Sequence, residues 1–194
     1  MTVQTFTTEV HANGAKRYLF NNVVHREDGP AIEFPNGDKF WYINGKRHRE
    51  DGPAMELAYG VNVWCRDNNI HREGGPAVEY VKKKAAYWYV NGQFHRVNGP
   101  AKERTNGTKE WLVNGVHHRE DGPAIERSSG AKEWYINGKL HREDGPAVVR
   151  ANGSKVWYIH GNRVSEEMFN LYKNRTLDSK SVQIDGIKYK LTAE

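Results

Sequence analysis

A histidine followed directly by an arginine recurs six times along the chain. Imidazole and guanidinium groups at regular spacing could bind a metal ion, move a proton or hold an anion. Catalysis needs one constellation of acid, base and nucleophile, so six equivalent pairs favour a structural role performed six times. We expect each histidine to pack beside the tryptophans or bond a turn carbonyl, and each arginine to pair with a nearby carboxylate. The histidines are His25, His48, His71, His95, His118 and His141.

Other chemistry finds little support in the sequence. Adjacent residues such as His117 and His118 would point to opposite faces of a strand, which disfavours a shared metal ion. The single cysteine, Cys65, provides no thiol cluster. There is no glycine-rich phosphate loop, nucleophile elbow or paired zinc-ligand motif. We therefore expect a protein that is not an enzyme and that uses neither a metal ion nor a cofactor.

The pairs belong to a longer motif, His-Arg-x-x-Gly-Pro-Ala, whose copies are 23, 23, 24, 23 and 23 residues apart. A fixed period of this length is the signature of a repeat protein. All six tryptophans share one position in the repeat, and we expect their rings to pack on one another as the core. A stacking platform for nucleic-acid bases is the alternative. The tryptophans are Trp41, Trp64, Trp88, Trp111, Trp134 and Trp157.

Each repeat is typical of two strands and two turns. Residues 30–33 begin with proline, as the first residue of a strand can, and residues 39–43 are rich in aromatic and β-branched side chains. Asn36-Gly37 and Asn44-Gly45 offer two left-handed residues each for tight hairpin turns. The sequence predicts an all-β fold, an elongated, twisted array of about six 23-residue β-hairpin repeats.

The ends of the chain depart from the repeat. Residues 1–24 hold a half-repeat in which Tyr18 stands in for tryptophan, and residues 25–164 hold the six repeats. Residues 165–194 are predicted to form a short helix beginning near Ser165 and a last hairpin around Asp185-Gly186. We interpret this segment as a cap, because an uncovered array end would expose strand edges and apolar faces.

The pattern Trp-Tyr-Ile-Asn-Gly-Lys-x-His-Arg-Glu-Asp-Gly-Pro-Ala resembles the tandem repeats of proteins from large phages and giant viruses. Those repeats are in turn similar to MORN-type repeats, which are also short β-hairpins built around Tyr or Trp and Asn-Gly. The resemblance covers roughly residues 13–163. It implies a viral origin and, by analogy of fold alone, contact with proteins or lipids. It brings no catalytic residues.

Charge is concentrated in the middle of the chain. The net charge is +5, and residues 66–109 carry nine basic and four acidic residues, which accounts for all of it. Gly74, Val97 and Asn98 stand where other repeats carry acids, so we expect unpaired guanidinium groups at Arg72 and Arg96. A solvated charged surface is the simpler interpretation of the lysine run. The candidate ligand- or partner-binding residues are Arg72, Lys82, Lys83, Lys84, Arg96, Lys102 and Arg104.

These observations predict a non-catalytic binding protein that blocks a host factor by direct contact or sequesters an anionic, nucleotide-like signalling ligand. In the case of a protein partner, we expect exposed aromatic residues to matter most: Tyr80, Tyr87, Tyr89 and Phe94. A self-associating structural scaffold and a nucleic-acid-binding protein are the alternatives. The sequence has neither a secretory signal nor an apolar run of membrane-spanning length, and only one cysteine. We expect a cytoplasmic protein, in the host cell if viral, with no membrane partner.

Overall fold

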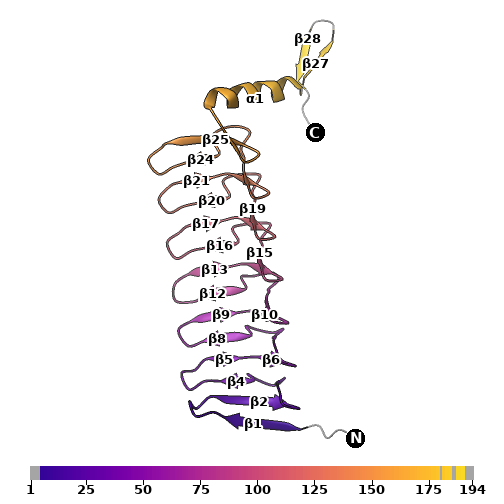
Figure 1. Ribbon diagram of the computed structural model, residues 1–194, viewed down its shortest axis with the longest axis vertical. Coiled ribbons are helices and arrows are strands. Elements are labelled where there is room, and N and C mark those ends of the chain that lie inside the picture. The colour runs from indigo at the N-terminus through magenta and orange to yellow at the C-terminus, as the bar shows by residue number, and fades with distance from the viewer. Residues whose placement is uncertain (1–4, 180, 185–186, 191–194) are drawn as a thin grey trace. The chain divides into compact units, whose positions relative to one another are not determined.

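The computed structural model of the chain describes residues 5–179, 181–184 and 187–190. Apart from one helix, its regular elements are antiparallel β-strands, which confirms the predicted all-β array of hairpins. The chain divides into two compact units, Met1–Val116 and His117–Glu194. In each unit the hairpins follow one another in chain order (Figure 1).

The first unit contains an antiparallel sheet whose strands are neighbours in chain order. These are β1 (Phe6–Val10), β2 (Lys16–Phe20), β4 (Ile32–Glu33), β5 (Lys39–Phe40), β8 (Met55–Leu57), β9 (Val61–Val63), β12 (Val78–Tyr80), β13 (Ala85–Tyr87), β16 (Lys102–Glu103) and β17 (Lys109–Glu110). The short β3 (Val23–Val24) also pairs with β2.

Separate two-stranded hairpins alternate with the strands of this sheet. They are β6 (Tyr42–Ile43) with β7 (Lys46–Arg47), β10 (Cys65–Arg66) with β11 (Asn69–Ile70), and β14 (Tyr89–Val90) with β15 (Gln93–Phe94). The strands β18 (Leu112–Val113) and β19 (Val116–His117) follow at the end of the unit.

The second unit repeats the same plan. Its sheet contains β20 (Ile125–Glu126), β21 (Lys132–Glu133), β24 (Val148–Val149), β25 (Lys155–Ile159) and β26 (Asn162–Val164). A separate hairpin joins β22 (Tyr135–Ile136) to β23 (Lys139–Leu140). The helix α1 (Glu166–Ser179) and the hairpin of β27 (Ser181–Ile184) with β28 (Ile187–Lys190) follow.

In the first five repeats, the second of the two sheet strands ends one residue before the tryptophan. We predicted one strand over residues 39–43, but β5 ends at Phe40 and β6 begins after Trp41. The Trp41 N–H donates to the Ala54 carbonyl at 2.9 Å, and the Trp41 carbonyl accepts the His48 N–H at 3.2 Å. Because these two bonds join the tryptophan to different segments, the chain leaves the sheet there and forms the small hairpin.

The two turns of a repeat have different backbones. Asn44 and Gly45 have φ angles of +49° and +75°, as a two-residue hairpin turn requires. At the other turn only Gly37 is left-handed, with φ +94°, so the prediction of two left-handed residues at Asn36-Gly37 is wrong. There the Asn36 side chain accepts the Asp38 N–H at 3.0 Å and closes a wider turn.

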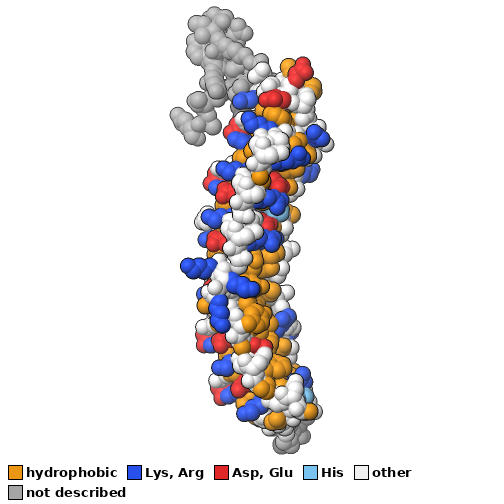
Figure 2. Space-filling model, turned by 90° about the vertical axis from the view of Figure 1, so that its left-hand side faces the viewer, with side chains coloured by type: hydrophobic (Ala, Val, Ile, Leu, Met, Phe, Trp, Pro, Cys, Tyr) orange, Lys and Arg blue, Asp and Glu red, His pale blue; other side chains and the backbone are white. Residues whose placement is uncertain are grey.

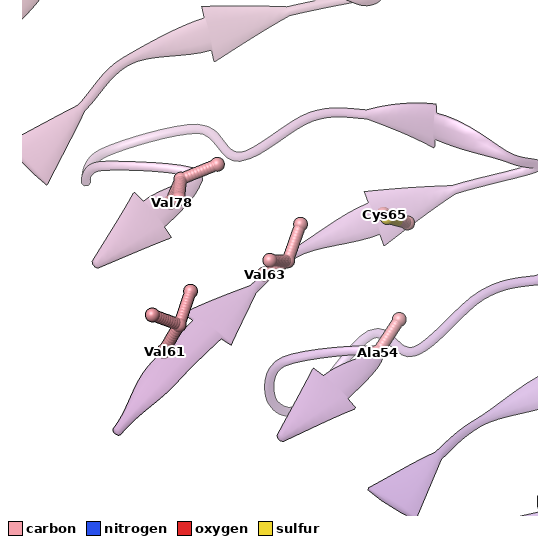
Figure 3. Packing of buried hydrophobic residues seen from close by; sticks show 5 residues of the cluster. All are labelled: Ala54, Val61, Val63, Cys65 and Val78. Atoms are coloured by element: carbon pink, nitrogen blue, oxygen red, sulfur yellow. The ribbon is translucent and has the colours of Figure 1, made fainter. Parts of the chain in front are cut away.

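The alanine of the Gly-Pro-Ala motif is the most completely buried residue of each repeat. In the first unit, Ala54 belongs to a cluster with Val61, Val63, Cys65 and Val78 (Figure 3). The motif alanines, all 0% exposed, are Ala31, Ala54, Ala77, Ala101, Ala124 and Ala147.

The helix begins as the sequence predicts. The Ser165 hydroxyl accepts the Met168 N–H at 3.1 Å, which satisfies one of the free donors of the first turn. Phe169 is buried, and α1 packs against β25. No helix among the described residues is both long and apolar enough to cross a membrane.

Candidate functional site

The six histidines bind the turns of the neighbouring repeats. In each case Nδ1 accepts a backbone N–H from the residue 19 or 20 positions later, at 3.1–3.4 Å. The expected structural role therefore has an observed contact, but the bonded group is a turn N–H and not a turn carbonyl. A neutral imidazole nitrogen is an acceptor, and the turn presents a donor at this place. The donors are the N–H groups of Asn44, Asp67, Asn91, Asn114, Asn137 and His160.

His141 differs from the other motif histidines because its partner in the turn is a second histidine. Its ring stacks on that of His160 with centroids 4.3 Å apart. Burial lowers the pKa of His141, and the neighbouring His160 lowers it further, while Glu143 acts in the opposite direction. A protonated Nδ1 could not accept the His160 N–H, so the contact requires the neutral ring.

The pH dependence follows from this lowered pKa. Since the unfolded chain binds the proton more readily, stability is fully present above the ordinary pKa near 6.5 and is lost as the pH falls below it. Replacing His160 with asparagine, the residue at this turn position in most other repeats, should raise the pKa of His141 and reduce the loss. Nuclear magnetic resonance titration of the His141 ring measures its pKa, and urea unfolding between pH 7 and 5 measures the loss of stability. An unaltered titration in the variant would contradict the assigned cause.

The arginine of each pair lies over an aromatic ring. In the five pairs described, the guanidinium carbon is 3.9–4.2 Å from the ring centroid. Arg26 lies over Tyr18, which confirms that this tyrosine takes the tryptophan position in the half-repeat. Trp41 and the other tryptophans are half-buried, and among the described residues no ring contact joins Trp41, Trp64, Trp88, Trp134 or Trp157 to one another. The expected spine of indole on indole is therefore wrong: arginines cover the rings and alanines fill the core.

The expectation of unpaired guanidinium groups at Arg72 and Arg96 is also wrong. Arg72 donates to Glu79 at 2.8 Å, and Arg96 donates to Glu103 at 3.3 Å. These carboxylates lie seven residues after the arginines, on the first sheet strand of the repeat, and the sequence did not predict them as the partners.

Four aromatic side chains of the first unit form one cluster, as a protein-contact surface would require. The centroid of the Tyr87 ring lies 5.8 Å from that of Tyr80 and 6.3 Å from that of Phe94. The ring centroids of Tyr89 and Phe94 are 4.1 Å apart. Burial raises the pKa of Tyr89, with smaller contributions from Tyr87 and Tyr80, so its hydroxyl remains a neutral donor.

These rings line a groove of about 430 Å³, which we call the aromatic groove. Figure 2 shows hydrophobic side chains exposed beside basic ones on the surface of the first unit. The signal in the sequence is the fourth residue after the motif proline, which is Phe34, Leu57 or Tyr80 in the first three repeats and arginine in the last three. Besides the four rings, the groove is lined by Leu57, Tyr59, Val61, Val63, Ile70, Val78, Lys102 and Arg104.

Two of the candidate basic residues lie in the aromatic groove. Lys102 approaches Glu110 at 3.4 Å and lies 4.0 Å from the centroid of the Phe94 ring. Arg104 donates to the same carboxylate, with Nη2 at 2.7 Å. Lys102 and Arg104 therefore share one carboxylate, that of Glu110, as their ion-pair partner among the described residues.

The remaining candidates are divided between two places. Residues 82–84 are exposed in the turn between β12 and β13, and Lys84 has φ +51°. Arg72 and Arg96 lie with the tryptophans instead. Trp64, Arg72 and Arg96 are not among the residues that line the aromatic groove. The structure thus brings together Lys102 and Arg104, but not all seven candidates.

Features that would support catalysis are few in the described part of the chain. No three His, Cys, Asp or Glu side chains there are grouped as metal ligands. Cys65 is buried, and burial raises the pKa of its thiol, which disfavours the reactive thiolate.

Fold and surface together define an all-β hairpin repeat protein with an aromatic groove bordered by cations. No protein-family model matches the chain, and a search of curated proteins found no match.

Proposed function

We propose that the chain is a non-catalytic binding protein whose aromatic groove receives an extended segment of a partner protein. The segment carries apolar side chains for the groove and carboxylates for its basic end. The single observation that carries this proposal is the clustering of four aromatic rings beside Lys102 and Arg104. Inhibition of a host factor, suggested by the resemblance to viral repeat proteins, would be one consequence of such contact.

The apolar part of the groove supports a protein partner. Half-buried tyrosine and phenylalanine rings give large contact areas at low entropic cost, and such residues dominate protein interfaces. Tyr59 is 64% exposed at the border, and Tyr80, Tyr87 and Phe94 are half-buried. A partner that covered these rings would gain the energy of burying them.

Charge determines which partner is favoured. The shared carboxylate of Glu110 leaves one positive charge in excess over the pair Lys102 and Arg104. The exposed run of residues 82–84 adds three lysines to the same unit. An acidic segment would be attracted to this surface and a basic one repelled.

The test uses a short fluorescent peptide that alternates tyrosine with glutamate. Replacing Tyr89 and Phe94 with alanine together should weaken its binding at least about tenfold, because aromatic contact residues typically contribute more than about 1 kcal/mol each. Fluorescence anisotropy measures the change. A peptide with lysine in place of glutamate should bind much more weakly to the unaltered protein.

The chain offers a matched control. Tyr135 and Leu140 form the same cross-strand pair in the second unit that Tyr89 and Phe94 form in the first. Alanine at those two positions removes similar side chains and should leave peptide binding unchanged. If both double variants bind the acidic peptide equally well, the aromatic groove is not its site.

A further inference from the structure

The motif arginine has a repeated set of contacts on the tryptophan side of the array. Besides covering the ring, Arg49 donates from Nη1 to the Pro53 carbonyl at 3.3 Å and to Glu56 at 3.0 Å. Its Nε donates to Asp51, two residues later, at 2.9 Å. The same Nε contact with aspartate, at 2.6–2.8 Å, occurs at Arg26, Arg119 and Arg142. In these repeats the guanidinium is held on several sides.

Two consecutive repeats lack that aspartate. Gly74 follows Arg72 and Asn98 follows Arg96 at this position. Both arginines keep the rest of the set: each covers its tryptophan at 3.9 Å and donates from Nη1 to a proline carbonyl and a glutamate. Within the described residues, no acid contacts the Nε edge of either one. Each of the two guanidinium groups is thus held in place, while its Nε–H, which four other repeats pair with an aspartate, has no acid partner among the described residues.

The exposure of these side chains agrees with that difference. Arg72 and Arg96 are 32% and 30% exposed, whereas the four arginines with aspartate partners are 20–25% exposed. A planar guanidinium with adjacent N–H donors matches the geometry of a carboxylate or a phosphate, and stacking on a ring orients it before any ligand arrives.

We propose that Arg72 and Arg96 are two oxyanion-binding sites, one repeat apart, that each receive a carboxylate or phosphate oxygen of a ligand where other repeats place their own aspartate. Neither arginine lines the aromatic groove, and the site does not depend on the peptide proposal. Its ligand is a molecule with at least two oxyanions.

The two sites differ in strength. The loop after Arg72 keeps one acid, Glu73, which lines a cleft of about 310 Å³ together with Arg72 and with charged residues of both signs from the preceding repeat. The loop after Arg96 has Val97 and Asn98, so it carries neither of the acids found in the consensus repeat. The weaker acidic surroundings make Arg96 the tighter of the two sites.

The test restores the missing carboxylate. In the variant Asn98→Asp, an internal aspartate competes with the ligand at Arg96, as it does in four other repeats, while Gly74 is kept because its φ of +74° would strain an aspartate there. The probes are tripolyphosphate and a penta-glutamate peptide at constant ionic strength, and the readout is the nitrogen-edited resonance of each arginine Nε–H group. The unaltered protein should show saturable shifts at Arg96 and Arg72, and the variant should bind about tenfold or more weakly at Arg96. The stronger probe tells whether phosphate or carboxylate is preferred.

A control variant changes charge without changing the site. Asn106 accepts the Thr108 N–H through its side-chain oxygen, and aspartate can keep that bond. Asn106→Asp therefore adds one negative charge to the same repeat and should leave the shifts intact. Shifts that are equal at Arg49 and Arg96, that persist at Arg96 in the Asn98→Asp variant, or that are absent with both probes would overturn the proposal.

Discussion

Replacing Ala147 with leucine is expected to lower the free energy of unfolding of the second unit by about 3 kcal/mol or more, near or beyond the upper end of typical overpacking costs. The alanine is 0% exposed, and the N–H of Trp134 donates to its carbonyl at 2.8 Å. Its side chain therefore lies where neighbouring strands approach most closely. Extra methyl groups there must displace backbone, and displaced backbone breaks the bonds between repeats. Urea unfolding followed by circular dichroism measures the loss.

The same repeat contains its own control. Ala151 is exposed in the turn after β24, and leucine there should change stability by less than about 0.5 kcal/mol. If Ala147→Leu is as harmless as Ala151→Leu, the alanine positions have room to spare and the core lies elsewhere.

Much of the fold could be predicted because the repeat supplies six copies of each local signal. The register of tryptophan, proline and Asn-Gly locates strands and turns, and Ser165 marks the start of α1. The position of the core could not be predicted in the same way. Large aromatic rings suggest burial, yet the tryptophans are half-buried and the most completely buried position is the motif alanine, such as Ala77.

The binding surface was harder to predict because its contacts cross strands. The partners of Arg72 and Arg96 are found seven residues later, after the turn that the motif itself creates. Tyr89 and Phe94 could be named as candidate contact residues, but they were expected to be exposed and are half-buried, and their contact depends on the hairpin that begins after Trp88. The composition instead favours one continuous strand through Trp88. Such a strand would have kept Tyr89 and Phe94 apart from the apolar residues of the sheet.

The tryptophan position provides the second large effect. Trp64→Ala should lower the free energy of unfolding by about 2–3 kcal/mol, less than the 3–5 typical of a fully buried ring because Trp64 is only half-buried. Part of the loss is the interaction with Arg72, whose guanidinium lies 3.9 Å from the ring centroid. Such a contact contributes about 0.5–1 kcal/mol at exposed sites. Denaturant unfolding of the two proteins measures the difference.

Tyrosine at the same position separates stacking from size. The half-repeat already places Arg26 over Tyr18 at 4.1 Å, so a phenol ring satisfies the geometry that the arginine requires. Trp64→Tyr should therefore cost less than about 1 kcal/mol, and most of the alanine effect should be absent. If tyrosine and alanine destabilise the protein equally, the ring contributes by filling volume that only an indole fills, and the stacked arginine adds nothing measurable. The comparison thus determines whether arginine–ring stacking, repeated along each unit, is a source of stability or only a consequence of the fold.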